Sequence, residues 1–66
     1  MSTYVVKRLS DGLVCLTVTH ISCIPDARDL ASLYGAGYVL LENGRKTSAT
    51  RRKELLALRA NARKEN

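Results

Sequence analysis

The chain has no Trp and no Phe, and its only aromatic residues are three Tyr. The hydrophobic core must therefore be built from Val, Leu, Ile, Ala and these Tyr side chains. Two Cys residues are too few for the disulfide framework that stabilises many small secreted domains. A chain of 66 residues is one domain at most, and domains near this size bury only about 60% of the surface of the unfolded chain. We therefore expect a single small domain, residues 1–66, with a homodimer as its supplementary source of stability.

Long apolar runs are the second absence. The N-terminal residues MSTYVVKRLSDG lack the apolar stretch of a secretory signal, and no stretch elsewhere approaches the length of a membrane span. These absences predict a cytoplasmic protein with reduced thiols and no membrane partner.

Acidic residues are scarce at the C-terminal end of the chain. Residues 45–66 contain eight Lys and Arg against two Glu, a net charge of +6. Residues 1–44 contain three cations against four acids, a net charge of −1. Essentially all of the formal net charge of +5 therefore lies in residues 45–66, and an imbalance this local indicates a surface for an anionic partner.

The N-terminal part of the chain contains the signals of a β-hairpin. Tyr and Val residues predict a strand over residues 3–9, and alternating apolar residues predict a second over residues 13–21. The turn signal Ser10-Asp11-Gly12 lies between them, so the two strands should pair antiparallel. Their buried face is expected to include Val14, Leu16 and Val18.

A helix, two strands and a second helix follow. Pro25 should open the first helix, residues 25–34. Residues 38–42 form the next strand, and Asn43-Gly44, a strong hairpin signal, leads to a short polar edge strand, residues 45–48. The order ββαββα predicts an α+β fold: a small antiparallel sheet with two helices, of which the C-terminal one is basic.

The C-terminal helix, predicted over residues 50–64, has two distinct faces. Leu55, Leu58 and Ala62 share the face expected to pack on the core. Arg52, Arg59 and Arg63 lie within about 40° of one another on a second face. Residues 45–66, the basic return strand and helix, thus form the segment of greatest functional interest.

The charges of this helix oppose its own stability. Three cations, Arg51, Arg52 and Lys53, occupy the first turn, where the helix dipole disfavours positive charge. Arg59 and Arg63 repel each other at a spacing of four residues. Only Arg51 and Glu54 form a compensating pair by sequence spacing. A bound anion would remove both penalties, and phosphate suits a helix start with nearby hydroxyl groups.

These features predict a small basic nucleic-acid-binding regulator or accessory protein that contacts the phosphates of DNA or RNA. The predicted contacts are Arg45, Lys46, Thr47, Ser48, Thr50, Arg51, Arg52, Lys53, Arg59 and Arg63. No known DNA-binding or RNA-binding signature is present in the sequence, so contacts to the backbone are expected in place of base recognition.

Three alternatives remain open from the sequence. The cations could form a solvated face that keeps a small protein in solution. The chain could instead be a protein-interaction module, an inhibitor or adaptor that docks on a larger complex through the basic helix and the edge strand 45–48, against an acidic protein surface. The helix could also serve as a dimer element, because Leu55, Leu56 and Leu58 offer more apolar surface than one core contact requires.

Catalysis, cofactor binding and metal binding are not expected. Cys15, His20 and Cys23 are three potential zinc ligands within nine residues, but a structural site needs four, and a regular strand would place Cys15 and His20 on opposite faces. His20 and Cys23 could act as a base and a nucleophile, yet no third residue or oxyanion donor accompanies them. We expect no enzyme, no cofactor and no resident metal.

Overall fold

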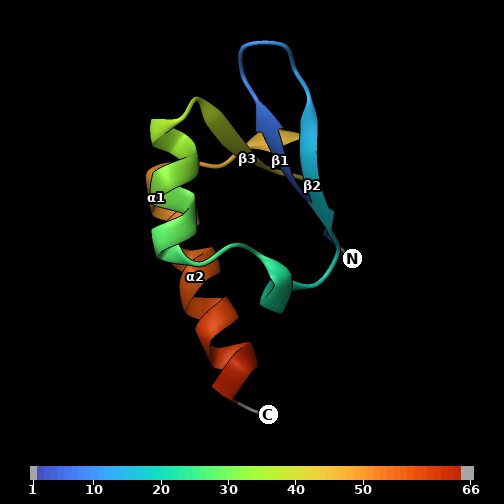
Figure 1. The fold of residues 1–66 in the computed structure, drawn as a ribbon. Coiled ribbons are helices and arrows are strands. Elements are labelled where there is room, and N and C mark those ends of the chain that lie inside the picture. The colour runs from blue at the N-terminus through green and yellow to red at the C-terminus, as the bar shows by residue number, and fades with distance from the viewer. Residues whose placement is uncertain (1, 65–66) are drawn as a thin grey trace.

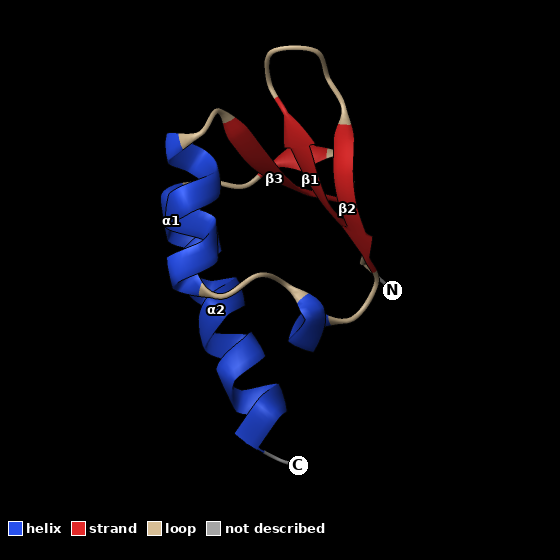
Figure 2. Ribbon diagram, viewed as in Figure 1, coloured by secondary structure: helices blue, strands red, loops and turns tan. Residues whose placement is uncertain are grey.

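The computed structural model describes residues 2–64 and confirms the α+β class and the ββαββα order. The sheet is one layer, and the helices lie together against one side of it (Figure 1 and Figure 2). The elements are β1 (Tyr4–Arg8), β2 (Val14–Val18), the 3₁₀ helix η1 (Ile21–Cys23), α1 (Ala27–Gly35), β3 (Tyr38–Glu42), β4 (Arg45–Lys46) and α2 (Ala49–Lys64).

The sheet has four strands in the order β2-β1-β3-β4, and all neighbouring pairs are antiparallel. β1 and β3 occupy the centre, so β2 and β4 are its two edges. Val6 of β1 is flanked by Leu16 on one side and Leu40 on the other. Because cross-strand partners share a face, these three side chains point toward the same side of the sheet.

The β1–β2 hairpin forms as predicted, but its second strand is shorter and less buried than expected. β2 ends at Val18, because His20 caps η1 by accepting a hydrogen bond from the amide of Ser22. A β-bulge interrupts the register between Val6 and Lys7, and Val14 pairs with Lys7. The bulge therefore moves Val14 to the face opposite Leu16.

The expected burial of β2 is wrong. Val14 is 53% exposed and Leu16 is 37% exposed, and only Val18 packs against the core. The reason is tertiary: the helical layer covers β1 and β3 but leaves β2 open (Figure 1). An alternating pattern shows that a strand has a face suited to burial, not that another layer reaches it.

The first helix, α1, begins at Ala27, two residues later than predicted. Asp26, and not Pro25, marks its start: the Asp26 carboxylate accepts a hydrogen bond from the Asp29 amide at 2.9 Å. This bond lowers the pKa of Asp26. Leu30 is the buried residue of α1, and Gly37, at φ +87°, allows the chain to turn into β3.

The β3–β4 hairpin follows the sequence closely. Asn43 and Gly44 both have positive φ, as the predicted two-residue turn requires. Asn43 also ties the turn to the start of β1, because its side chain accepts from the Thr3 amide at 2.9 Å. The ladder ends after Lys46, two residues before the predicted end of this strand.

The core lies between the sheet and the helices. Its buried cluster is Tyr4, Val6, Ile24, Leu30, Leu40 and Leu55. Leu55 of α2 is fully buried, and Leu56 packs against the cluster from the side. The prediction that Leu58 faces the core is wrong, since it is 48% exposed. Among residues 2–64, no helix is long and apolar enough to cross a membrane.

Candidate anion-binding site

The predicted site begins where β4 passes into α2. Ser48 caps the helix: its hydroxyl accepts from the Arg51 amide at 3.1 Å, and its carbonyl accepts from the Arg52 amide at 2.9 Å. The helix therefore starts at Ala49, one residue before the predicted Thr50. The Thr47 side chain is buried, and its hydroxyl donates to the Leu40 carbonyl at 3.0 Å. Both hydroxyls thus have structural partners.

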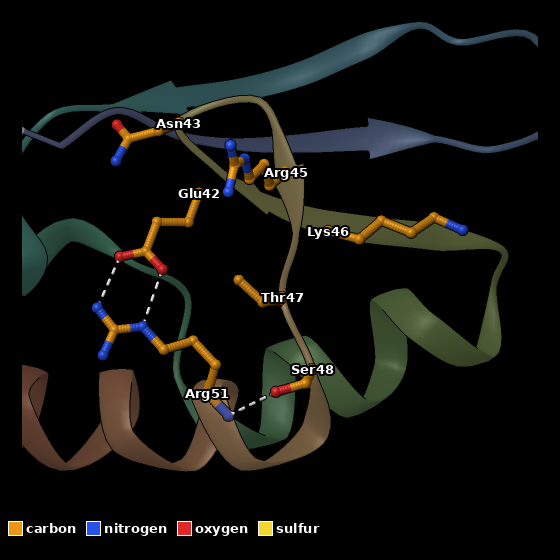
Figure 3. A pocket seen from close by; sticks show the side chains of 7 residues that line it. All are labelled: Glu42, Asn43, Arg45, Lys46, Thr47, Ser48 and Arg51. Atoms are coloured by element: carbon orange, nitrogen blue, oxygen red, sulfur yellow. Dashed lines mark hydrogen bonds and ion pairs between the residues drawn. The ribbon is translucent and has the colours of Figure 1, made fainter.

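Arg51 pairs with two carboxylates, Glu42 and Glu54, and Figure 3 shows the pair with Glu42. Its Nε and Nη2 groups donate to the two Glu42 oxygens, each at 2.8 Å, and Nη1 donates to Glu54 at 3.1 Å. The bidentate pair lowers the pKa of Glu42 and raises that of Arg51. The Glu42 side chain is only 17% exposed, so this pair is more protected from water than the pair with Glu54, which is 56% exposed.

An open hollow of about 530 Å³ lies beside this network (Figure 3). Five of the ten predicted contact residues line it. Its lining residues are Glu42, Asn43, Arg45, Lys46, Thr47, Ser48 and Arg51. Three of these are cations and one is an acid, so the lining has an excess of positive charge. With Arg51 paired to Glu42, Arg45 lies on the Glu42 face of the sheet, and the Lys46 side chain extends away from that pair (Figure 3). We refer to this feature as the basic hollow.

Arg52 and Arg59 lie on a different side of α2 and are also engaged. Arg52 donates to the Thr47 carbonyl at 3.0 Å, and its guanidinium stacks 4.4 Å from the centre of the Tyr34 ring. Arg59 Nε donates to the carbonyl of Ile24, which precedes α1. The two side chains therefore fix α2 to the chain around α1.

The remaining predicted residues are exposed on α2. Thr50, Lys53 and Arg63 are in contact with solvent, and no side-chain hydrogen bond or ion pair in the described part of the chain involves them. Helical geometry places Lys53 and Arg63 away from the side of α2 that faces the hollow. The structure thus separates the ten residues into the five of the basic hollow, a stripe of Arg52, Arg59 and Arg63, and two further exposed residues, Thr50 and Lys53.

The expectation that Arg51 alone among the α2 cations has a compensating partner is wrong for Arg52 and Arg59, whereas Lys53 and Arg63 have no side-chain partner in the described chain. Arg51, Arg52 and Arg59 find their partners in Glu42, Tyr34 and the carbonyls of Thr47 and Ile24. Sequence spacing reveals only partners on the same helix. The partners found in the structure lie outside α2, and most of them are distant in the sequence. One signal was available: Glu42 follows Tyr38 and Leu40 on the core-facing row of β3, and a carboxylate there requires a cationic partner.

The other chemically capable side chains do not assemble into a site. Cys15 and Cys23 are free thiols, both exposed. The His20 ring bonds with the hydroxyl and the amide of Ser22, two residues along the chain. Within residues 2–64, no group of three or more His, Cys, Asp or Glu side chains is placed to hold a metal ion.

Comparisons with protein-family models, with curated proteins and with solved structures found no match to this chain.

Proposed function

We propose that this protein is a small regulatory or accessory protein that binds nucleic acid by contacting its phosphates in the basic hollow. The observation that supports this most directly is the gathering of five predicted contact residues around one open, positively charged depression. The start of α2 lies at the same place, and the partial positive charge of a helix start favours anions.

The cations of the hollow differ in how many of their N–H donors already bond to other residues of the protein. Arg45 and Lys46 are exposed, and no side-chain partner is found for either in the described chain. Arg51 uses three of the five N–H donors of a guanidinium on Glu42 and Glu54, which leaves two for a ligand. Arg45 and Lys46 would therefore supply the charge, and Arg51 would supply a fixed donor.

Glu42 limits what the hollow accepts. Its carboxylate neutralises Arg51 and repels an anion that approaches too deeply. Phosphates of a nucleic-acid backbone can remain at the rim, where Arg45 and Lys46 reach them. Contacts of this kind depend on charge and not on base sequence.

The first experiment uses fluorescence anisotropy to measure binding of the full chain to mixed-sequence DNA and RNA over a range of salt concentrations. The affinity should fall steeply as salt rises, since each phosphate contact releases counterions. The double variant Arg45→Gln/Lys46→Gln should reduce the slope of log affinity against log salt by about two units.

The matched control removes the same charge elsewhere. Lys7→Gln/Arg28→Gln changes one cation on β1 and one on α1, and it should leave the salt slope nearly unchanged. Equal loss of binding in both double variants would mean that net charge, and not the hollow, attracts the nucleic acid. Absence of binding to DNA and RNA at low salt would refute the proposal.

A second candidate function is docking on an acidic surface of a larger protein complex. The observation in its favour is Leu58, which is 48% exposed on α2. One apolar side chain beside cations suits a mixed protein interface more than a phosphate backbone. Under this alternative, Leu58→Ser would weaken binding to the partner and binding would persist at high salt. Under the leading proposal, Leu58→Ser leaves nucleic-acid affinity unchanged.

A further inference from the structure

The outer edge of β2 is unlike the rest of the molecular surface. β2 is the first strand in the order β2-β1-β3-β4, and Figure 1 shows it at the margin of the sheet, away from α1 and α2. Within residues 2–64 no strand pairs with its outer side. Its backbone N–H and C=O groups on that side are therefore available for a further strand.

Apolar side chains surround this edge. Leu16 faces the helical side of the sheet at 37% exposure, and Val14 faces the other side at 53%. Leu13, which precedes the strand, is 52% exposed, and Leu9, across the turn, is 56% exposed. The main exposed apolar side chains of the sheet therefore gather around one strand, and a partner there would bury them from both faces.

The same edge is electrically neutral. Residues 12–25 contain no Asp, Glu, Lys or Arg, although the whole chain has 11 basic and 6 acidic residues. Two copies of a chain with a net charge of +5 repel each other over most of their surfaces. The β4 edge is unsuitable for self-pairing, because Arg45 and Lys46 would meet their own copies. The β2 edge is the place where like-charged copies can approach without that cost.

We propose that β2 pairs antiparallel with β2 of a second copy, about a twofold axis near Leu16, to form a continuous sheet of eight strands. In this arrangement the two Leu16 side chains lie opposite each other on the helical side of the sheet. The twofold axis makes the contact self-complementary and closes it at two copies. The bulge next to Val14 shortens the regular part of the strand, which limits pairing to one short partner strand.

The small core gives a reason for this dimer. Only seven hydrophobic side chains are buried in the described chain, and no residue of β2 is among them. A domain of this size commonly requires stabilisation beyond its own core. Pairing through β2 would extend the core across the twofold axis and would provide hydrogen-bond partners for the backbone N–H and C=O groups on the outer side of β2.

The test is sedimentation of the full chain from micromolar to millimolar concentration, without nucleic acid and in reducing buffer so that Cys15 and Cys23 cannot cross-link. The wild-type chain should shift from monomer to dimer as concentration rises. Leu16→Lys brings two ammonium groups together at the axis and should weaken dimerisation by about a hundredfold.

Leu58→Lys is the matched control, because it makes the same change at a similarly exposed Leu on α2. It should leave the dimer intact. Hydrogen exchange gives a second readout: amides of residues 14–18 should become more protected as the wild-type chain is concentrated, but not in Leu16→Lys. Circular dichroism of both variants at low concentration verifies that each folds.

Three outcomes would overturn the proposal: a wild-type chain that stays monomeric, a dimer that survives Leu16→Lys, and a dimer disrupted by Leu58→Lys but not by Leu16→Lys. The last would move the interface to α2. Because the basic hollow lies at the other edge of the sheet, none of these results depends on whether nucleic acid binds.

Discussion

The two edges of this sheet differ in almost every property that matters for recognition. β2 has five residues, no charge and apolar side chains exposed on both faces. β4 has two residues, Arg45 and Lys46, both cationic. Short length and positive charge are common ways in which proteins prevent an edge strand from pairing with another chain. β4 is therefore protected from other strands and open to anions, whereas β2 is open to a strand.

The edges also differ in how firmly they are joined to the helical layer. Next to β4, the Glu42–Arg51 pair, the Thr47–Leu40 bond and the Ser48 cap connect the sheet to the start of α2, all within residues 40–51. On the helical side of β2, only Val18 reaches the core. The role of an edge strand therefore depends on its charge and on the elements that cover it, and not on its position in the sheet alone.

The largest expected effect comes from truncating a side chain of the hydrophobic core on which the whole sheet depends. Leu55→Ala should lower the free energy of unfolding by about 2–5 kcal/mol, since the side chain is fully buried. A chain of this length is stable by only about 3–10 kcal/mol, so partial unfolding is expected. Denaturant unfolding followed by circular dichroism measures the loss.

Leu58→Ala is the control for this prediction, because its side chain is half-exposed on the same helix. It should change the free energy of unfolding by about 0.5 kcal/mol or less. Equal losses in the free energy of unfolding of the two variants would show that α2 does not pack on the core through Leu55. The helical layer would then not cover the sheet in the way described.

A smaller effect is expected where the β4 edge is joined to α2. Glu42→Gln keeps the shape of the side chain but removes its charge, and it should lower the melting temperature at pH 7 by about 4–8 °C. The pKa of Glu42 is lowered from the usual 4.5 in the folded protein. Its stabilising contribution is therefore present above pH 4.5 and is lost as the pH falls through the lowered pKa.

The wild-type and Glu42→Gln melting temperatures should converge in acid, a result that a purely steric role for Glu42 would not produce. Glu54→Gln provides the comparison, since Glu54 bonds to the same guanidinium but is 56% exposed. Its effect at pH 7 should be the smaller of the two. If Glu54→Gln is the more damaging, α2 is stabilised along its own axis and not by β3.

The smallest expected effect concerns the Tyr34 ring beneath Arg52. The Tyr34 hydroxyl is buried and has no hydrogen-bond partner in the described chain. Tyr34→Phe keeps the ring that stacks on Arg52 and removes this unsatisfied group, so stability should stay the same or rise by about 1 kcal/mol. Tyr34→Leu, which loses the ring, should be destabilising. A clear loss in Tyr34→Phe would reveal a partner for the hydroxyl.

Local features of this protein were predictable because neighbouring residues produce them. The Asn43-Gly44 turn, the extent of β3 and the order of strands and helices follow from backbone preferences and short-range periodicity. The basic hollow was predictable in part, since five of its seven lining residues come from one continuous basic segment. Asn43 and Glu42 were not predicted for it, because their roles depend on the path of β3.

The fold class, the two-residue turn and the concentration of positive charge at the C-terminal end could all be predicted from the amino-acid sequence. These properties arise from interactions between residues close together in the chain. The folded arrangement was needed to establish that the helices leave β2 uncovered, that Leu58 stays exposed, and that Glu42 pairs with Arg51. Such outcomes depend on which surfaces meet after the chain has folded back on itself, and no local pattern encodes that meeting.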